Sequence, residues 1–225
     1  RSAWEDENAL FVGTKGGFPQ ISHSDMDMGT FTLAALGQEW GIEFYPLVGS
    51  RAGFPSQFRM TRYMYYGASP QGHNTLFFDP SATYPNLDYG QELTAYTRFE
   101  DFYSGENSAY SIMDLSDAYR RYASSLKRGI ALINNRREFL IQDELVSGAR
   151  NTLYWFMHTK ADITTNGNTA VLSNGEERLY CKILSPVDAT FEVLPAVALP
   201  NTPTIADFDD TAYPTIKKLS IKMPV

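Results

Sequence analysis

Short runs of alternating apolar and polar residues recur along almost the whole chain, and a two-residue period is what β-strands produce. The runs are rich in Val, Ile, Tyr and Phe, and residues such as Gly, Pro, Asn and Asp separate them. The alternation predicts strands at residues 9–13, 30–35, 39–45, 74–79, 92–100, 108–115, 127–133, 137–145, 152–158, 169–173, 178–184, 190–194 and 216–223. So many short strands favour an all-β fold, a large antiparallel β-sandwich with little helix.

Two predicted turns have strong local signals. Asn134-Asn135 and Asn174-Gly175 each join two alternating runs, and both residue types tolerate the positive φ that a tight hairpin demands. Residues 116–124 have helix-like spacing, with Ser116 or Asp117 as a candidate cap. Both a short helix and a turn fit that stretch.

Two longer segments interrupt the strand pattern. Residues 46–72 combine Gly, Pro, Arg and aromatic residues without alternation, which indicates a loop that covers something. Residues 199–215 are rich in Pro, Asp and Thr and are typical of a surface excursion. No repeat and no linker divides the chain, so residues 1–225 are predicted to form one domain.

The composition and the first residues of the chain indicate a folded β-domain that belongs to a longer protein. Apolar residues make up 43% of the 225 residues, which suffices for a core, and no apolar run approaches the ~20 residues that cross a bilayer. Residues 1–20 lack the basic-then-apolar layout of a signal peptide. The chain starts at Arg1-Ser2 without Met, so we interpret it as a piece of a longer protein.

Charge and cysteine content narrow the possible partners. A formal net charge of −7 argues against nucleic-acid binding, which needs a basic face, although local Arg side chains can still bind an anionic ligand. Cys181 is the single cysteine, so there is no internal disulfide and no thiolate metal cage, and its apolar surroundings indicate core packing. The 14 Tyr, 14 Phe and 3 Trp suit strand packing and also stacking on sugars.

The candidate chemistry lies in three places in the first third of the chain. If the segment around residue 25 is extended, His23, Asp25 and Asp27 point to one face, where a divalent metal would bring their like charges together. Glu43 stands inside an apolar run and needs a ligand or a donor, because an unpaired buried carboxylate costs several kcal/mol. His73 stands where a loop meets a strand.

The residues alone also allow a plainer interpretation. Asp25 and Asp27 can be solvated turn residues, and Glu43 can pair with a nearby Arg. A His-x-Asp-x-Asp spacing does not by itself distinguish a metal site from such a polar network.

Four segments together resemble the heparinase II/III family: Gly13–Gly17, Ser22–Phe31, Leu36–Glu43 and Gly72–Leu76. Their order is that of the family's C-terminal β-domain: a Lys-Gly-Gly turn, a His-x-His-x-Asp-x-Gly-Ser-Phe strand, an acidic strand end and a His-Asn-Thr-Leu strand start. Later segments at 136–137, 142–144 and 155–159 are also similar. The likeness therefore runs over most of the chain and is most specific in its first 80 residues.

The resemblance implies a supersandwich-like C-terminal domain of a bacterial lyase that cleaves acidic polysaccharides, such as heparan sulfate or alginate, by β-elimination at a uronic acid. It also implies a helical toroid before this domain, with the active cleft between the two, and a periplasmic or secreted location. The expected partners are thus the acidic polysaccharide and the toroid, without nucleic acid or membrane. Because the toroid carries the tyrosine and asparagine that act at the uronate, this chain alone is expected to be inactive.

Position by position, the resemblance assigns roles to five residues. His23 matches the histidine that reaches the cleft and assists proton transfer. Asp25 stands where the family has a histidine zinc ligand, Glu43 where it has an aspartate ligand, and His73 matches the remaining histidine ligand. Asp27 matches the motif's own Asp, which either supports the ligands from behind or fixes the turn. A site of Asp25, Glu43 and His73 implies a divalent metal, with zinc expected first and manganese, calcium or magnesium in competition, because two of the three ligands are carboxylates.

Other basic residues are open to more than one interpretation. Residues 67–70 are small and polar where family members often carry arginines. Arg51, Arg59 and Arg62 in the preceding loop can bind substrate anions instead, or can be solvated surface residues. His158 follows an apolar run and is expected to be a hydrogen-bonded core or rim histidine rather than a catalytic one.

Two other classes of function fit the sequence. One is a non-catalytic carbohydrate-binding sandwich that uses Tyr and Trp side chains to stack on sugars, and the other is a metal-dependent hydrolase on a β-scaffold. Ultraviolet absorbance separates them from a lyase, because only a lyase creates an unsaturated uronate.

Overall fold

The computed structural model describes residues 1–21, 24–43, 60–79, 90–148, 151–202 and 213–225. These residues form antiparallel strands, and their helical elements are three short 3₁₀ helices, so the all-β prediction is confirmed. The strands are β1 Phe11–Thr14, β2 Phe31–Ala35, β3 Gln38–Gly41, β4 Leu76–Phe78, β5 Arg98–Ser104, β6 Ala109–Asp114, β7 Ala123–Ile133, β8 Glu138–Ser147, β9 Thr152–Thr159, β10 Asp162–Asn166, β11 Thr169–Asn174, β12 Glu177–Lys182, β13 Phe191–Pro195 and β14 Lys217–Pro224. The 3₁₀ helices are η2 Met60–Met64, η3 Tyr66–Ala68 and η4 Pro70–Gly72.

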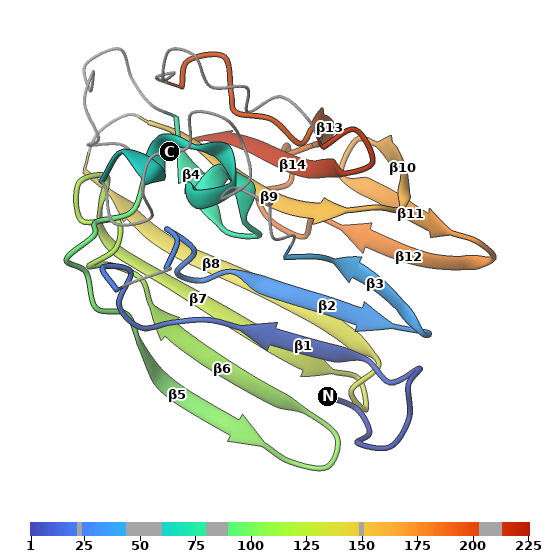
Figure 1. Ribbon diagram of the computed structural model, residues 1–225. Helices are drawn as coiled ribbons and strands as arrows, with labels where there is room; N and C mark the ends of the chain where they lie inside the picture. The colour runs from blue at the N-terminus through green and yellow to red at the C-terminus, as the bar shows by residue number, and fades with distance from the viewer. Residues whose placement is uncertain (22–23, 44–59, 80–89, 149–150, 203–212) are drawn as a thin grey trace.

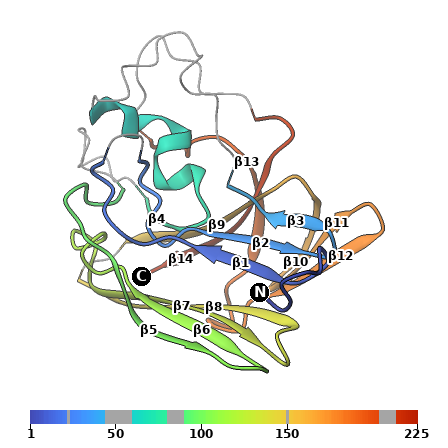
Figure 2. The same ribbon diagram turned by 60° about the horizontal axis from the view of Figure 1, so that its bottom comes forward.

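The strands form four antiparallel sheets, with orders β1-β2-β3, β5-β6-β7-β8, β13-β14-β9-β4 and β10-β11-β12. The β5–β8 sheet makes one layer and the β1–β3 sheet faces it (Figure 2). The β13-β14-β9-β4 and β10–β12 sheets continue the fold at the other end of the molecule (Figure 1). The three 3₁₀ helices lie over the end of β4, next to the segment that leads into β2 (Figure 1).

The main core lies where these layers meet. Phe31 of β2 and Trp40 of β3 are fully buried and share a cluster with Ile130 of β7 and Leu219 of β14. The Phe31 ring lies 5.5 Å from that of Phe139, between ring centroids. Burying each such aromatic side chain contributes roughly 1.5–3 kcal/mol, so the facing sheets hold one another in place.

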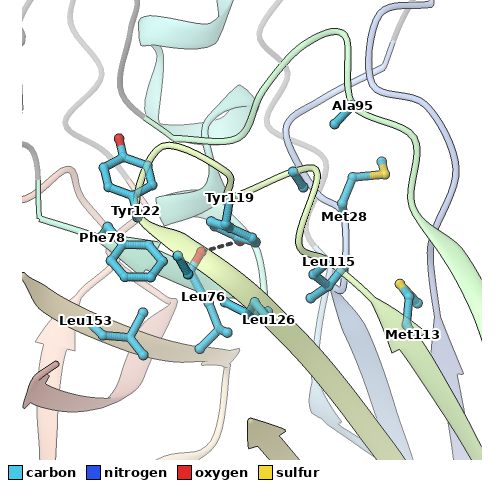
Figure 3. Packing of buried hydrophobic residues seen from close by; sticks show 12 residues of the cluster. Met28, Leu76, Phe78, Ala95, Met113, Leu115, Tyr119, Tyr122, Leu126 and Leu153 are labelled. Carbon is cyan, nitrogen blue, oxygen red and sulfur yellow. Dashed lines mark hydrogen bonds between the residues drawn. The ribbon is translucent and has the colours of Figure 1, made fainter. Parts of the chain in front are cut away.

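A second core cluster supports the end of the sandwich that carries the site. Met28, Leu76 and Phe78 pack with Tyr119 and Tyr122 (Figure 3). The Phe78 and Tyr122 rings stack with centroids 4.7 Å apart. The Tyr119 hydroxyl donates a 2.6 Å hydrogen bond to the Leu76 carbonyl, so this buried phenol also fastens the start of β4.

The alternation of β7 shows how the sequence makes a half-buried strand. Leu126, Arg128, Ile130 and Leu132 point inward at every second position, and the residues between them are more exposed. Arg128 is the exception to apolar burial. Its guanidinium makes two hydrogen bonds of 2.7 and 2.8 Å to the carboxylate of Asp143 on β8, which compensates the buried charge.

Both predicted hairpins are confirmed. The β7–β8 turn has Asn134 and Asn135 at φ values of 51° and 55°, and Gly175 of the β11–β12 turn has a φ of 60°. Most predicted strands also match to within a few residues, although β7 begins four residues earlier, at Ala123.

Two predictions about elements are wrong, and one open alternative is decided. Residues 116–122 form turns, so of the helix and the turn that both fit this stretch the turn is found, and the chain then enters β7. Residues 92–97 lie outside a regular strand, because Glu92 is buried as an acceptor for Arg120 and Thr97 makes only an isolated bridge to Gly17. Strand β10 was missed, because its Asp-Ile-Thr-Thr-Asn sequence has a single strongly apolar residue.

The two interrupted segments are partly described. Within the predicted loop 46–72, residues 60–72 form the three 3₁₀ helices, and the side chains of η3 and η4 are buried rather than solvated. Residues 44–59 and 203–212, which include most of both segments, lie outside the described residues. No helix in the described ranges is long and apolar enough to span a membrane.

Candidate functional site

The site lies where three segments meet beside the sandwich core. Residues 24–30 lead into β2, Glu43 follows β3, and His73 ends η4 just before β4. The side-chain amide of Asn74 fastens these segments together, because its Nδ2 donates to the carbonyls of Phe31 at 2.8 Å and Ile42 at 3.0 Å. Because Asn74 is fully buried, each of these bonds satisfies a backbone group that water cannot reach.

Residues 24–30 contain no strand, so the extended conformation under which His23, Asp25 and Asp27 would share one face is not found in the described part of this segment. Met26 and Met28 turn into the core, and the Met26 N–H bonds to the Ala68 carbonyl at 3.0 Å. Gly29 makes the turn with a φ of +78°, and a Cβ there would come within 2.7 Å of Leu115. Only glycine fits both the conformation and the space.

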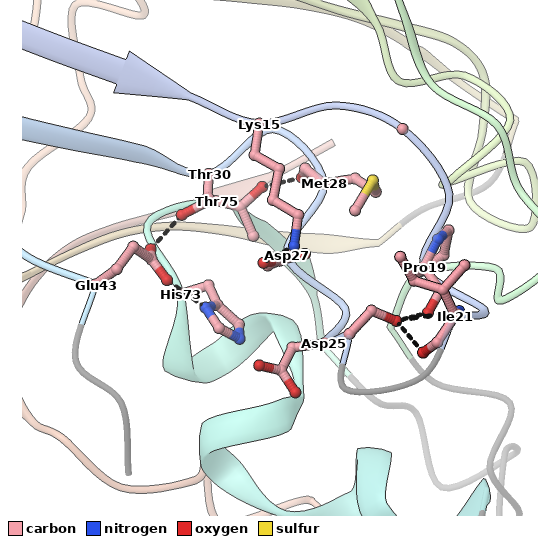
Figure 4. Close-up of polar contacts among 12 residues, drawn as sticks. Lys15, Pro19, Ile21, Asp25, Asp27, Met28, Thr30, Glu43, His73 and Thr75 are labelled. Atoms are coloured by element: carbon pink, nitrogen blue, oxygen red, sulfur yellow. Dashed lines mark hydrogen bonds and ion pairs between the residues drawn. The ribbon is translucent and has the colours of Figure 1, made fainter. Parts of the chain in front are cut away.

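Glu43 and His73 form the centre of the site. Their side chains meet in a 2.6 Å contact between Glu43 Oε2 and His73 Nδ1 (Figure 4). The Thr30 hydroxyl and the Asn74 N–H both donate to Glu43 Oε1, the latter at 3.2 Å. The expected proximity of Glu43 and His73 is therefore confirmed. The Glu43 side chain is 28% exposed rather than buried, and it has the donors that the sequence interpretation required.

Two further carboxylates lie near His73, and each has a cation of its own. Asp25 Oδ1 is 2.7 Å from an Nη atom of Arg62 on η2, and Asp27 Oδ2 is 2.5 Å from Nζ of Lys15. The Arg62 side chain is only 8% exposed, so it is a buried ion-pair partner and neither a solvated nor a loop-tip arginine. Arg51 and Arg59 lie outside the described residues.

Electrostatics at the site favour a protonated His73. Burial lowers the pKa of the imidazole, but the charge and hydrogen bond of Glu43, together with the charges of Asp27 and Asp25, raise it to about 9. Burial raises the pKa of the Glu43 carboxyl, but His73, Thr30 and Asn74 outweigh this effect and hold that pKa below its usual value. Burial raises the pKa of Asp25, against the opposing effects of His73 and Arg62.

Two buried atoms of the site have no hydrogen-bond partner: Nε2 of His73 and Oδ1 of Asp27. The ring of His73 stands between Glu43 on one side and Asp25 on the other (Figure 4). A buried polar atom without a partner is uncommon in folded proteins and often marks a ligand or a water site.

The predicted metal ligands are arranged as ion pairs. Asp25 bonds to Arg62, and Glu43 uses its oxygens on Thr30, Asn74 and His73. Within the described ranges no three His, Cys, Asp or Glu side chains are close enough together to hold a metal ion. As arranged, Asp25, Glu43 and His73 do not fit one shared divalent ion, and metal binding by this protein stays an untested prediction.

The catalytic candidate His23 lies outside the described residues, so its role also stays a prediction. His158 is a core residue, as expected. It is fully buried, its Nδ1 lies 3.1 Å from Asn74 Oδ1, and its Nε2 lies 2.5 Å from the Tyr66 hydroxyl. Burial, followed by the charge of Lys218, lowers its pKa well below the usual value.

Two residues that the sequence interpretation did not single out, Asn74 and Arg128, position the site, and a third, Lys218, packs against Tyr66 of η3. Asn74 belongs to the His-Asn-Thr-Leu motif, which by itself gives this residue no role. Arg128 donates to the carbonyl of Gly29 at 2.6 Å and to that of Asn74 at 3.3 Å, so it fastens both site segments to β7. Lys218 is fully buried, with its Nζ 4.8 Å from the Tyr66 ring centroid and 2.8 Å from the Val197 carbonyl. The only available signal was a basic residue at an inward position of a predicted strand.

No family model matches the chain, and no curated protein matches it. Solved structures do match. The chain shares its fold with heparan sulfate lyases. The heparan sulfate lyase HepC from Pedobacter heparinus superposes with a TM-score of 0.70 at 16% identity, covering 100% of this chain and 32% of that one. A heparinase III superposes with a TM-score of 0.66 at 16% identity, and the match covers 97% of this chain and 31% of that one.

A second heparinase III gives a TM-score of 0.57 at 15% identity and covers 93% of this chain and 31% of its own. The chain therefore spans about a third of the length of the structures that it matches. The resemblance noted in the motifs is confirmed at the level of the fold.

Proposed function

We propose that this chain is the β-sheet part of a lyase that cleaves an acidic, uronate-containing polysaccharide by β-elimination. The observation that carries the proposal is that Thr30, Glu43 and Asn74, from three segments that each resemble a lyase motif, share one hydrogen-bonded site. The fold shared with heparan sulfate lyases supports it.

The reaction requires a base, an acid and a way to neutralise the uronate carboxylate. The base takes the proton from C5, the C4–O4 bond breaks with its electrons going to O4, and O4 takes up a proton as a C4–C5 double bond forms. His23 is our proposed partner in proton transfer. Neutralisation of the carboxylate and the other proton-transfer group fall to the helical toroid that we expect elsewhere in the protein.

The described residues contribute positioning in this proposal. His23 is two residues before Asp25 and four before Asp27, and these are tied to Arg62 and Lys15. These two ion pairs limit how far Asp25 and Asp27 can move. Restricting them matters in this proposal because small displacements of a catalytic group reduce rates steeply.

The test uses the longer protein and this chain alone, each incubated with heparan sulfate, hyaluronan, chondroitin sulfate and alginate. Ultraviolet absorbance of the unsaturated product is followed. The longer protein should cleave one of these polymers. The isolated chain should be slower by at least ~10²–10³-fold, because electrostatic groups of that importance would be missing.

The variant His23→Ala should lower turnover of the longer protein sharply without moving its unfolding midpoint. Asn168→Ala, in the turn between β10 and β11, is the matched control and should leave turnover unchanged. Robust activity of the isolated chain would place the catalytic centre elsewhere. Tight binding of a polymer without any unsaturated product would favour a carbohydrate-binding domain. The proposal also includes an exported location, which cell fractionation tests.

A further inference from the structure

The acidic side chains of the site are matched one to one with cations. Asp27 pairs with Lys15 at 2.5 Å, Asp25 with Arg62 at 2.7 Å and Glu43 with His73 at 2.6 Å. The Asp25 and Asp27 side chains are only 18% and 10% exposed, so water screens their charges weakly. A divalent ion would therefore enter a site whose carboxylates already have positive partners.

Arg62 occupies the place beside Asp25 where a metal ion would have to bind. Its guanidinium remains positively charged under all ordinary conditions, offers only donors and cannot ligate a metal. The side chain lies against the Tyr63 ring, with its guanidinium carbon 5.3 Å from the ring centroid, which fixes it further. A metal bound by Asp25 would have to displace Arg62 or lie beside a buried positive charge.

Glu43 is engaged in a comparable way. Oε1 accepts from the Thr30 hydroxyl and the Asn74 N–H, and Oε2 bonds to His73. Binding of a metal by Glu43 would break part of this set and leave a buried donor without a partner, which is unfavourable because a donor away from water has no substitute acceptor.

We propose that Arg62 holds this site together in place of a metal ion, so that the chain folds and keeps the site assembled without any divalent cation. Arg62 is here a positioning residue, which fastens the segment before β2 to η2. Assembly of the site by Arg62 does not depend on the proposed reaction, and it would be the same if the chain only bound polysaccharide.

The first test measures metal in the unaltered chain, purified with any affinity tag removed. Elemental analysis should find far less than one divalent ion per chain. The midpoint of thermal unfolding should not change with a chelator or with added zinc, manganese or calcium salts, because an ion that binds only the folded state would raise it. One bound ion per chain, or a midpoint that falls with the chelator, would overturn the proposal.

The second test is a double-mutant cycle on Arg62 and Asp25. Arg62→Met and Asp25→Asn should each lower the unfolding midpoint by roughly 5–10 °C, because each leaves one charge of a largely buried pair without its partner. The unfolding midpoint of the double variant should fall by clearly less than the sum of the two single decreases.

Lys217→Met is the matched control, because Lys217 forms an exposed pair with Asp162 in which the side chains are 38% and 87% exposed. It should shift the midpoint by no more than about 2 °C. Additive losses at Arg62 and Asp25, or losses no larger than that of the control, would contradict the role of Arg62. If Arg62→Met fails to fold, the metal measurement on the unaltered chain still decides the proposal.

Discussion

Replacing Asn74 by alanine should destabilise the chain more than its small volume suggests. The Asn74 amide donates to the carbonyls of Phe31 and Ile42 at 2.8 and 3.0 Å, and its Oδ1 accepts from the His158 N–H at 2.6 Å. All three backbone groups would lose a buried partner. At about 1–3 kcal/mol for each group, and with some relaxation, the free energy of unfolding should fall by roughly 3–6 kcal/mol.

Urea unfolding of the Asn74→Ala chain, followed by circular dichroism, measures this loss. The midpoint should fall while the slope with denaturant is unchanged, because the same surface is exposed on unfolding. Asn168→Ala is the control, since that side chain makes one long 3.4 Å bond to the Ile183 carbonyl. A loss at Asn74 below about 1 kcal/mol, or equal to the control, would show that these bonds do not hold the three segments together.

The remaining predictions concern buried charge. The pKa of His73 in the folded state is raised to about 9. The stability that its protonation contributes is therefore complete below about pH 6.5 and is lost as the pH rises through 9. His73→Gln should remove that part of the pH dependence of the unfolding free energy in denaturant titrations. Burial lowers the pKa of Lys218 to about 7, so the folded state gains stability between about pH 7 and 10.5, opposite in sign, and Lys218→Met should abolish that gain. Asp143→Asn should cost about 3–5 kcal/mol in urea unfolding, because Arg128 would keep a buried charge without its carboxylate, and a loss under 1 kcal/mol would contradict this account.

The alternation of apolar and polar residues predicted those strands in which every second side chain is buried against the core. The β7–β8 hairpin is an example, because alternation in both strands and two Asn residues at the turn all indicate the same structure. Residues 92–97 have a similar alternation, yet tertiary contacts override it. Glu92 accepts a hydrogen bond from Arg120, 28 residues away in the chain, and among the described residues the ladder pairing of this segment is limited to the single bridge between Thr97 and Gly17.

For the site, residue types and motif order predicted that Glu43 and His73 would come together, 30 residues apart in the chain. Their partners could not be found in the same way. The pairing of Arg62 with Asp25 depends on where η2 packs, and Lys218 is buried only because β14 runs between β9 and β13. A lysine in an alternating run is ordinarily a solvent-facing residue, so only the tertiary arrangement shows that this side chain is buried.

The position of β14 in its sheet has a consequence for biosynthesis. β14 lies between β13 and β9, so β9 gains its second neighbour only after residues 217–224 have left the ribosome. Until then the backbone N–H and C=O groups along that edge of β9 have no strand partner, and such an edge can pair with other chains. Nascent chains stalled before residue 217 should thus be the aggregation-prone species during synthesis, and chaperones that bind exposed strands are expected to act on them.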